Sequence, residues 1–459
     1  MKNFIYIVMT LALINVSCTT QTGKTKTQDK SCEVQLITLA PGHFHAALVQ
    51  KTSYPQVCKD VFVYAPEGNE LKDHLKRIEG YNTRAESPTA WAQIVYTGPD
   101  FLEKMLSEKK GNVMITAGNN GQKTAYLKAA LSAGLHVLAD KPMAITVDNF
   151  NMLSECFEIA RKNGVLLYDI MTERFEITTI LQKEFSMIPG VYGEQLLGTP
   201  DNPGILKESV HHFLKTVSGS PLIRPAWFFD VEQQGNGIVD VTTHLVDLVM
   251  WGCFPGQSID YKKDVELIDA NRWTTPISRA EFQKVTGMDV FPDYLKKDLR
   301  DDVLHVYSNG DMTFKIKGVC AKLGVIWNYS FPEGGGDTHY SVMKGSKSHL
   351  IIEQGKAQGY KPVLTIKAVK GVDLEKELSE AIKTIAAKYP GVALLKQQEG
   401  VWTVDIPASY HNGHEAHFGQ VTENFLKFLA EGALPEWEVP NMITKYYITT
   451  HTLELAKKK

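Results

Sequence analysis

Residues 115–146 read ITAGNNGQKTAYLKAALSAGLHVLADKPMAIT, and this stretch decides the fold. A strand-forming run ends at Ala117, a helix-forming segment follows over 123–134, and a second strand-forming run, HVLAD, ends at Asp140. Strands that alternate with helices in this way indicate a parallel sheet covered on both faces. Because such sheets bind ligands beyond the carboxyl ends of their strands, the tripeptide Asp140-Lys141-Pro142 is predicted to face a ligand crevice.

The same alternation extends from Val34 to about Ile170, whereas the sequence beyond about residue 172 has a different texture. The segment VLHVYSNGDMTFKIKG is predicted to be a hairpin that turns at Asn309-Gly310, because Asn-Gly favours a tight turn between strands. The strand runs that follow predict an antiparallel meander, one face of which can form the wall of a site or a subunit interface. A charged amphipathic helix, LEKELSEAIKTIAAKY, lies inside a predicted insertion over 361–402.

The chain begins with a segment typical of export. MKNFIYIVMTLALINVSC contains an apolar run, 4–16, that is too short to span a bilayer and has the length of a signal-peptide core. A small residue followed by Cys18 resembles the bacterial lipoprotein cleavage site, although Asn15 stands where that pattern prefers an aliphatic residue. We therefore expect a signal peptide over 1–18, lipidation of Cys18, a polar tether over 19–32 and a lipid-anchored location in the bacterial cell envelope. A plain secretory peptide or an uncleaved anchor is the alternative.

Composition narrows the class of protein. The chain has 459 residues, 43% of them hydrophobic, and a formal net charge of −3, which is ordinary for a soluble protein of two or three domains. No concentrated basic segment indicates a nucleic-acid partner, and we expect membrane contact only through the lipid anchor. Six widely scattered cysteines without CxxC spacing form neither a disulfide framework nor a zinc motif, although an incidental disulfide is left open.

The first strand-to-helix turn, LAPGHFHAAL over 39–48, lies where dinucleotide-binding sheets carry G-x-G-x-x-G. Ala40, Gly42 and His45 stand at the three glycine positions, so only the glycine that admits the phosphates is kept. We expect the helix N-terminus to remain an anion site, with Ala40, Gly42, His43 and His45 beside the cofactor. His43 and His45 could equally be loop histidines that shape the turn. The end of the next strand, VFVYAPEG, offers neither an acid for a ribose nor a base for a 2′-phosphate, which leaves NAD and NADP both open.

Two distant stretches together resemble the glucose–fructose oxidoreductase/inositol dehydrogenase (Gfo/Idh/MocA) family. In that family a Pro-Asn turn, an Ala-Gly-(Lys)-His-Val segment and a Glu-Lys-Pro tripeptide follow one another. Gly118-Asn119, Gly134–Val137 and Asp140-Lys141-Pro142 stand here at the same spacing. The second stretch, GNGIVDVTTHLVDLVMWG, resembles the family's glycine-rich entry into a helix that carries Asp-x-x-x-His, with Asp240 and His244 in those places.

The resemblance implies an α/β protein with a Rossmann dinucleotide-binding domain over 33–171. An α+β domain with a large, mostly antiparallel sheet is expected to follow over 172–459. It also implies NAD or NADP as cofactor, with Gly118, Asn119, Asp140 and Lys141 among the residues beside it. The implied substrate is a sugar, glycoside or polyol that lies between the nicotinamide and the large sheet, and that sheet is the candidate surface for a homo-oligomer.

Oxidation of a secondary alcohol requires a base for the hydroxyl proton while a hydride leaves the carbon. His244 suits the acid/base role because an imidazole titrates near neutral pH. Lys141 is expected to stabilise the developing alkoxide or to relay its proton, and these two roles could be exchanged. Asp240, four residues before His244, is expected on the same helix face, where it orients a substrate hydroxyl or holds Lys141 protonated. Asp247 continues that face and is expected to be structural.

Further polar residues are candidates for substrate contact. Arg174 in MTERFE resembles an arginine that approaches substrate in the family, and KESVHHFLK supplies His212 beside His211. Trp227 in AWFFD could stack on a sugar face or belong to a buried aromatic cluster. No metal site is predicted, because His414 and His417 lack the open two-turn spacing of a zinc helix.

The sequence supports a preferred function and two alternatives. The preferred function is an NAD(P)-dependent oxidoreductase that acts on CH–OH groups through Lys141, Asp240 and His244. Free nicotinamide cofactor is scarce outside the cytoplasm, so the cofactor is either retained and recycled or used in a redox-neutral reaction that cleaves a glycosidic bond after transient oxidation. The other alternative is a non-catalytic sugar-binding lipoprotein with a degenerate nucleotide site, although such a protein would not need a proton relay.

Overall fold

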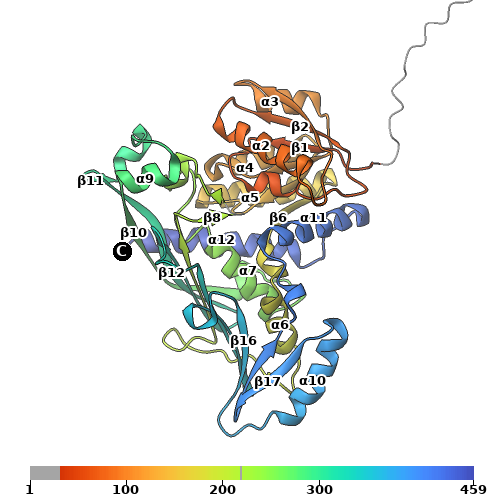
Figure 1. The fold of residues 1–459 in the computed structure, drawn as a ribbon, viewed down its shortest axis with the longest axis vertical. Coiled ribbons are helices and arrows are strands. Elements are labelled where there is room, and N and C mark those ends of the chain that lie inside the picture. Colours follow the sequence, from red (N-terminus) through yellow and green to blue (C-terminus); the bar gives the residue numbers. More distant parts are fainter. Residues whose placement is uncertain (1–31, 218–219) are drawn as a thin grey trace, which may run out of the picture.

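The computed structural model describes residues 32–217 and 220–459 (Figure 1). The expected signal peptide, the lipidation site Cys18 and the tether up to residue 31 lie outside the described residues. No helix within the described ranges is long and apolar enough to cross a membrane.

The first part of the chain forms a six-stranded parallel sheet in the order β3-β2-β1-β4-β5-β6. Its central strands read as continuous apolar runs and are buried on both faces, as the sequence predicts for a Rossmann sheet. The edge strand β3 was not identified from the sequence, because most residues of AQIVYT are exposed and the segment lacks the apolar run of the central strands. The strands are β1 (Leu36–Leu39), β2 (Asp60–Ala65), β3 (Ala92–Thr97), β4 (Val113–Thr116), β5 (His136–Asp140) and β6 (Leu167–Ile170).

Helices connect these strands, and their ends follow local capping chemistry. The Thr146 hydroxyl accepts a hydrogen bond from the Asn149 amide at the start of α5, and Gly164 ends that helix in the left-handed conformation. The polar segment at 67–81, whose sequence fits a helix or a loop, is mostly helical. The helix after β1 is a single turn, much shorter than expected. The helices are α1 (His45–Leu48), α2 (Asn69–Thr83), α3 (Phe101–Glu108), α4 (Asn120–Ser132) and α5 (Val147–Asn163).

The second part of the chain forms a ten-stranded sheet with the main order β10-β12-β13-β7-β14-β15-β16-β18-β17. Its pairs are antiparallel except for β13 with β7, so the large sheet is mostly antiparallel, as the sequence predicts. The strands are β7 (Ile205–His212), β10 (Val265–Ser278), β11 (Leu299–Arg300), β12 (Val303–Ile316), β13 (Val319–Asn328), β14 (Thr338–Lys344), β15 (Ser348–Gln354), β16 (Val363–Ala368), β17 (Ala393–Gln398) and β18 (Val401–Asp405).

The predicted hairpin at Asn309-Gly310 is wrong, because β12 continues straight through it. The chain reverses at Lys317-Gly318, where both residues have positive φ angles of 50° and 84°. Gly310 is required by close packing, since a Cβ there would lie 2.4 Å from Ile238 Cγ1. The Asn309 side chain is committed to the sheet: its Nδ2 donates to Thr275 Oγ1 at 2.8 Å. Asn309-Gly310, although typical of a turn, therefore allows β12 to pack closely against the segment that contains Ile238.

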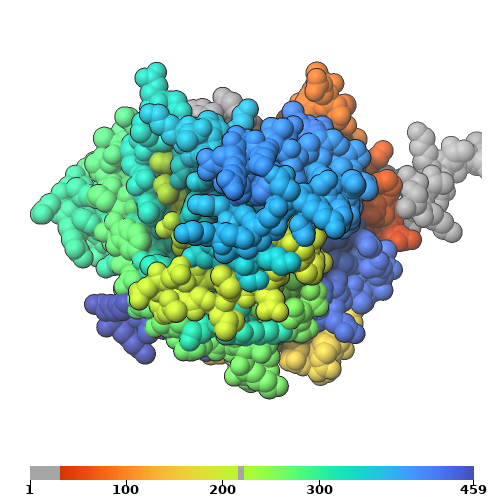
Figure 2. All heavy atoms as spheres, turned by 90° about the horizontal axis from the view of Figure 1, so that it is seen from below, coloured from red at the N-terminus to blue at the C-terminus, as the bar shows by residue number. Residues whose placement is uncertain are grey.

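The predicted insertion over 361–402 is built into the edge of the large sheet. It supplies β16, β17, the start of β18 and the helix α10 (Glu375–Lys388), which was predicted from its periodicity. Leu378 and Ile385 of α10 are buried in the same core as strands β15 and β16. In the view from below, this segment (light blue) covers the end of the molecule far from the Rossmann sheet (Figure 2).

Four further helices pack around the large sheet, and two more close the fold: α6 (Ile177–Ser186), α7 (Thr242–Cys253), α8 (Tyr261–Asp264), α9 (Arg279–Thr286), α11 (His414–Glu431) and α12 (Glu438–Lys457). The last two return to the first sheet, where Phe418, Phe425 and Tyr446 share a core with residues of β1, β4 and β5. Helix α12 continues into the core of the large sheet through Ile448 and Leu453. The two sheets are therefore fixed against each other by the C-terminal helices.

One disulfide joins the described start of the chain to the Rossmann domain. Cys32 pairs with Cys58, just before β2, while Cys156, Cys253 and Cys320 are free. Cys32 and Cys58 thus form the incidental disulfide that the cysteine spacing left open. Disulfides persist mainly in oxidising compartments.

Candidate active site

A cavity of about 1460 Å³ lies between the Rossmann sheet and the large sheet, and Lys141, Asp240 and His244 all line it. The three residues come from distant parts of the sequence: Lys141 follows β5 at the carboxyl edge of the Rossmann sheet, and the other two lie at the start of α7. We refer to these three residues as the cavity triad. Their convergence is the arrangement that the sequence predicts.

Lys141 and Asp240 form a close ion pair on the cavity wall. The Lys141 Nζ donates to Asp240 Oδ1 at 2.6 Å, and the two side chains are only 11% and 8% exposed. The other Asp240 oxygen accepts from Gln234 Nε2 at 3.0 Å, which fixes the carboxylate. Asp240 lies in the turn before α7 and not on the helix itself, so its expected helical position is corrected although it still lines the same cavity as His244.

His244 presents an unused ring nitrogen. Its Nδ1 is buried and has no hydrogen-bond partner among the described residues. Burial, followed by the charges of Lys141 and His414, holds the pKa of His244 well below its ordinary value. The ring, which belongs to a residue that lines the cavity, is therefore neutral near pH 7.

The first β–α turn departs from the anion site expected there. The backbone N–H groups of Gly42 and His43 both donate to the Ala117 carbonyl at 3.0 Å, so neither is free for a phosphate. Because α1 is a single turn, its dipole is also weak. Gly42 permits close packing, since a Cβ there would lie 3.2 Å from the Trp227 ring and 3.3 Å from Gly118 Cα. Ala40 turns the chain with a φ of 45° and lines neither cavity.

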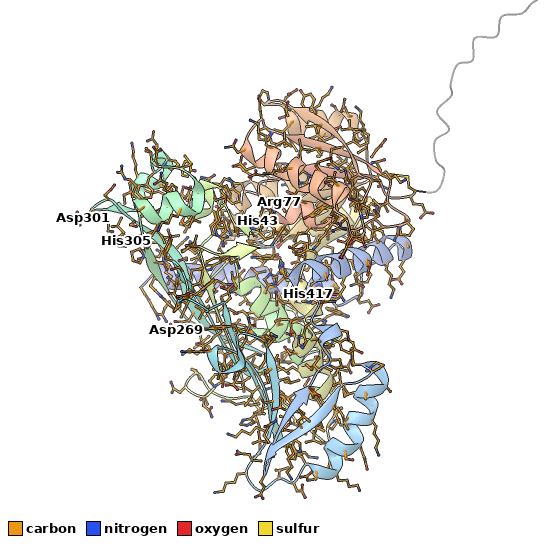
Figure 3. All side chains as sticks on the ribbon, in the orientation of Figure 1. His43, Arg77, Asp269, Asp301, His305 and His417 are labelled. Atoms are coloured by element: carbon orange, nitrogen blue, oxygen red, sulfur yellow. A yellow bond between two sulfur atoms is a disulfide. The ribbon has the colours of Figure 1, made fainter. Side chains whose placement is uncertain are left out.

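The region beside this turn nevertheless has room and charge for a dinucleotide. A second cavity, of about 420 Å³, is lined by Pro41–Phe44, by residues of α2 and by the segment 222–226. The two cavities adjoin at this point, because five residues border both: His43, Phe44, Leu222, Arg224 and Phe228. Figure 3 shows His43 and Arg77, which lines the smaller cavity, on the side of the Rossmann domain that faces the large sheet.

Arg224 is the cation at this junction. It is 5% exposed, and its guanidinium donates to the carbonyls of Phe213 and His212. No carboxylate in the described part of the chain forms a salt bridge with it, which is unusual because buried charges are normally paired. The residues present therefore fit an elongated anionic cofactor whose diphosphate meets Arg224.

Around Asp140, three histidines gather at the cavity. His45 Nδ1 lies 3.0 Å and His43 Nδ1 lies 3.9 Å from Asp140 Oδ2, and the two rings are 4.1 Å apart. The ring of His414, at the start of α11, is 5.2 Å from that of His45. Burial holds the pKa values of His43 and His45 well below their ordinary value and lowers that of His414 to about 4.

Of the other predicted cofactor contacts, some line the large cavity and one supports a turn instead. Gly118 lines the large cavity, with Asp140 and Lys141. Asn119 caps α4, where its side-chain oxygen accepts from the Gly121 amide, and its Nδ2 donates to Gln233 at 2.7 Å. Asn119 thus braces the turn and does not face the cavity.

Three predicted substrate contacts are corrected. Arg174 does not line the cavity, because its guanidinium is buried and bound to Asp247 and Glu438 at 2.6–2.7 Å. Trp227 belongs to a buried aromatic core and packs against Gly42. His212 is buried with its Nδ1 2.9 Å from Asp337, whereas the neighbouring His211 lines the cavity.

The wall formed by the large sheet contains residues that the sequence did not single out. Asp337 accepts from His212 and Lys215 and lies 3.5 Å from His211 Nδ1. Burial would raise the pKa of Asp337, but the hydrogen bond from His211 and the charge of Lys215 hold it well below its ordinary value. The adjacent histidines of KESVHHFLK were the feature of the sequence that pointed to this wall. Their acidic partner, Asp337, lies more than a hundred residues later, so the sequence did not reveal the pairing.

The chain matches two family models. Residues 181–457 match the model described as "Putative oxidoreductase C terminal domain", and residues 61–169 match "Oxidoreductase family, NAD-binding Rossmann fold". Together with the fold, these matches show that the chain belongs to the Gfo/Idh/MocA oxidoreductases and carries the NAD-binding Rossmann domain of that family.

Solved structures agree with this assignment. The crystal structure of a "putative oxidoreductase" from Parabacteroides merdae ATCC 43184 is 66% identical, with a TM-score of 0.92, 93% of this chain covered and 98% of that chain. A levoglucosan dehydrogenase in complex with NADH and levoglucosan is 14% identical, with a TM-score of 0.57, 93% of this chain covered and 98% of that one. A 3-ketoreductase from Actinomadura kijaniata in complex with NADP is 13% identical, with a TM-score of 0.54 and coverages of 90% and 95%. The last two show the fold alone, and no curated protein matches the chain.

Proposed function

We propose that the protein is an NAD(P)-dependent oxidoreductase that oxidises a secondary hydroxyl of a sugar, glycoside or polyol. The observation that carries this proposal is the cavity triad: an ammonium, a carboxylate and an unpartnered imidazole converge on one cavity. At about 1460 Å³, the cavity has room for both a nicotinamide and a sugar-sized molecule, since cofactor and ligand sites commonly measure about 300–1,000 Å³.

The residues of the junction would hold the cofactor. Arg224 would bind the diphosphate, the turn Pro41–Phe44 and helix α2 would border the adenosine half, and Gly118 with Asp140 would border the nicotinamide half. When bound, NAD(P) supplies the acceptor for the hydride. Because two turn amides are already bonded to Ala117, we infer that Arg224 replaces part of the usual backbone contribution to phosphate binding.

The chain's own residues handle the proton. Neutral His244 accepts the hydroxyl proton as general base, and the Lys141 ammonium stabilises the negative charge that develops on the oxygen. Asp240 fixes Lys141 through the 2.6 Å hydrogen bond and can orient a neighbouring hydroxyl of the substrate. The sugar or polyol class is supported by the levoglucosan dehydrogenase and the 3-ketoreductase, which share the fold.

We further propose that the protein works in the cell envelope, lipid-anchored through Cys18, and that its large sheet forms a homo-oligomer. The export-type segment at 1–18 and the Cys32–Cys58 disulfide support the location. Trp273 and Ile326, exposed on the large sheet, support the subunit interface. Membrane fractionation of wild type and Cys18→Ala, with light scattering of the released protein, tests both statements.

Cofactor content tests the enzymatic proposal directly. Purified protein is heated, the supernatant is read for nicotinamide absorbance, and thermal shifts are measured with added NAD and NADP. Retained dinucleotide or a specific shift, followed by cofactor reduction in a sugar screen, supports the proposal. Absence of both would instead leave a sugar-binding protein. Cleavage of a glycoside without net cofactor reduction would give the redox-neutral alternative, which an oxidising compartment poor in free cofactor favours.

A further inference from the structure

The histidine–aspartate cluster formed by His43, His45 and Asp140 has the composition and spacing of a metal site. One ligand atom from each residue lies within 4.8 Å of the others. We propose that this cluster binds one divalent transition-metal ion, with Zn²⁺ as the best-fitting ion. Such a site is distinct from the hydride chemistry above, which needs no metal.

Two of the three separations between donor atoms are close to those of a zinc site, and the third, between the two imidazole nitrogens, is below 4.8 Å. His43 Nδ1 also accepts a hydrogen bond from the His45 amide at 3.4 Å, which a bound ion would replace. A tetrahedral zinc ion about 2.0–2.1 Å from each donor holds neighbouring donors about 3.3 Å apart. Asp140 Oδ2 lies 3.0 Å from His45 Nδ1 and 3.9 Å from His43 Nδ1, so shifts of well under an ångström would bring these pairs to that separation. Two imidazoles and one carboxylate suit zinc and other first-row divalent ions and do not suit Mg²⁺ or Ca²⁺, which prefer oxygen ligands.

The carboxylate at the centre of the cluster has no lysine or arginine within salt-bridge distance among the described residues, although the nearby Lys123 ammonium acts on it electrostatically. Asp140 is 4% exposed, and its salt-bridge partners within the described ranges are His43 and His45 alone. Burial favours the neutral form of both rings. Asp337, on the opposite wall, has Lys215 at 3.1 Å. Among the described residues, Asp140 has no lysine in direct contact with its carboxylate of the kind that Asp337 has, so a bound ion would meet this carboxylate and the two imidazoles alone.

The cluster is held rigidly by its surroundings. The ring of His45 packs against Phe418 and Phe44, with ring centroids 4.6 Å and 4.5 Å away. The buried Lys123 donates to the Asp140 carbonyl at 2.8 Å and fixes the end of β5. Outer contacts of this kind orient ligands and strengthen metal binding.

The site also has an entry path and an open position. His43, His45 and Asp140 all line the large cavity, so an ion can reach them from solvent. His414, whose ring is 5.2 Å from that of His45, is the nearest additional imidazole and can serve as a fourth ligand. Without His414, a water or an oxygen of a polyhydroxylated substrate occupies the fourth position. Lys141 directly follows the ligand Asp140 in the chain.

Metal content of the full-length protein tests this proposal. Protein produced without a polyhistidine tag is dialysed and analysed for metals by mass spectrometry, and stripped protein is then titrated with Co²⁺ and Zn²⁺. We expect about one equivalent of zinc or a similar ion and a visible Co²⁺ absorption band that Zn²⁺ removes. Loss of an outer contact weakens metal binding about 10–100-fold. His45→Ala and Asp140→Asn each remove a proposed ligand and should weaken metal binding by more than that. His211→Ala, a matched control on the opposite wall of the same cavity, should bind normally.

Either of two results would overturn the proposal: wild type that holds no metal and gives no Co²⁺ band, or variants that bind metal as wild type does. If His45→Ala fails to fold, His43→Ala decides, because His43 is the more exposed ligand, at 19% of its side chain. The measurement uses no cofactor and no turnover. Failure to detect bound metal therefore does not affect the oxidoreductase proposal. Failure to detect bound dinucleotide does not affect the metal-site proposal.

Discussion

Two groups of charged residues meet at helix α7, one at His244 and one at Asp247, and they differ in what surrounds them. At the start of the helix, the cavity triad lines open space and includes an imidazole nitrogen without a partner. Farther along the helix, each member of a buried ion network has at least one oppositely charged partner within 3 Å: Asp169, Arg174, Asp247, Glu438 and Lys445. Both groups contain ion pairs, so ion pairing alone does not identify a functional site.

Position relative to the cavity is the property that distinguishes the two groups. In the buried network the charges hold elements together: Lys445 of α12 bridges Asp169 of β6 and Asp247 of α7 at 2.8 and 2.9 Å. Both groups contain buried acceptor atoms without a hydrogen-bond partner among the described residues: His244 Nδ1 in the triad, and Asp169 Oδ1 and Glu438 Oε2 in the network. The three residues of the triad line the cavity, whereas no member of the network does. Ionisable groups that converge on a cavity are thus evidence for chemistry, whereas paired charges away from it are evidence for architecture.

The comparison predicts the largest effect at Lys141. Lys141→Ala should lower turnover by about 10³-fold or more, because general acid–base and electrostatic contributions of single groups reach about 10²–10⁴-fold. Cofactor affinity should change little, since the partner of Lys141 is the reacting oxygen. Steady-state rates of cofactor reduction and a dinucleotide titration measure the two quantities. Lys361→Ala, an exposed lysine on the rim of the same cavity, is the control. Near-normal turnover in Lys141→Ala would remove this residue from the mechanism.

The buried network predicts a loss of stability and not of chemistry. Arg174→Ala should lower the free energy of unfolding by about 3–5 kcal/mol, because Asp247 and Glu438 are left buried without their partner. Arg161→Ala removes an arginine that is 78% exposed in an ion pair on the surface and should cost less than about 0.5 kcal/mol. Urea unfolding of both variants measures the difference. Equal stabilities would show that the network does not hold the fold together.

Local patterns in the sequence were sufficient for most of the fold. Apolar strand runs and helical periodicity identified five of the six Rossmann strands, and the amphipathic helix at 375–388 was recognised from its spacing. Asn309-Gly310 misled because a turn motif and a close-packing motif use the same residues. The surroundings of α1 could not be foreseen, since His45 packs against Phe418 from the other end of the chain.

The candidate site was predictable only where a motif carried it. Lys141, Asp240 and His244 stood in recognisable segments, and the structure brings them together. Arg174 was placed wrongly because its partner Glu438 is 264 residues away. Arg224 and Asp337 carry no local motif, and the contacts that place them at the cavity, to residues 211–215, form only once the second part of the chain has folded.

The junction of the two cavities predicts a smaller, selective effect. Arg224→Gln should weaken dinucleotide binding about 10–100-fold, equivalent to about 1.4–2.7 kcal/mol, because it removes charge-assisted hydrogen bonds to a phosphate. Turnover at saturating cofactor should stay within a few-fold of wild type. Fluorescence titration with NAD and NADP measures binding, and Arg300→Gln, an exposed arginine on the large sheet, is the control. Unchanged affinity in Arg224→Gln would mean that the guanidinium serves another anion.

The smallest predicted effect concerns pH and separates His244 from an ordinary histidine. An imidazole with a pKa near 6.5 that acts as base would make kcat/KM for oxidation rise roughly fourfold from pH 6 to pH 8. The pKa of His244 is lowered by burial, so its neutral form is already present at pH 6 and is lost only as the pH falls farther. We therefore expect a change of less than about twofold across this range, measured from initial rates of cofactor reduction. A steady rise through pH 8 would contradict the assignment, because the base would then be a group that loses its proton at higher pH than His244.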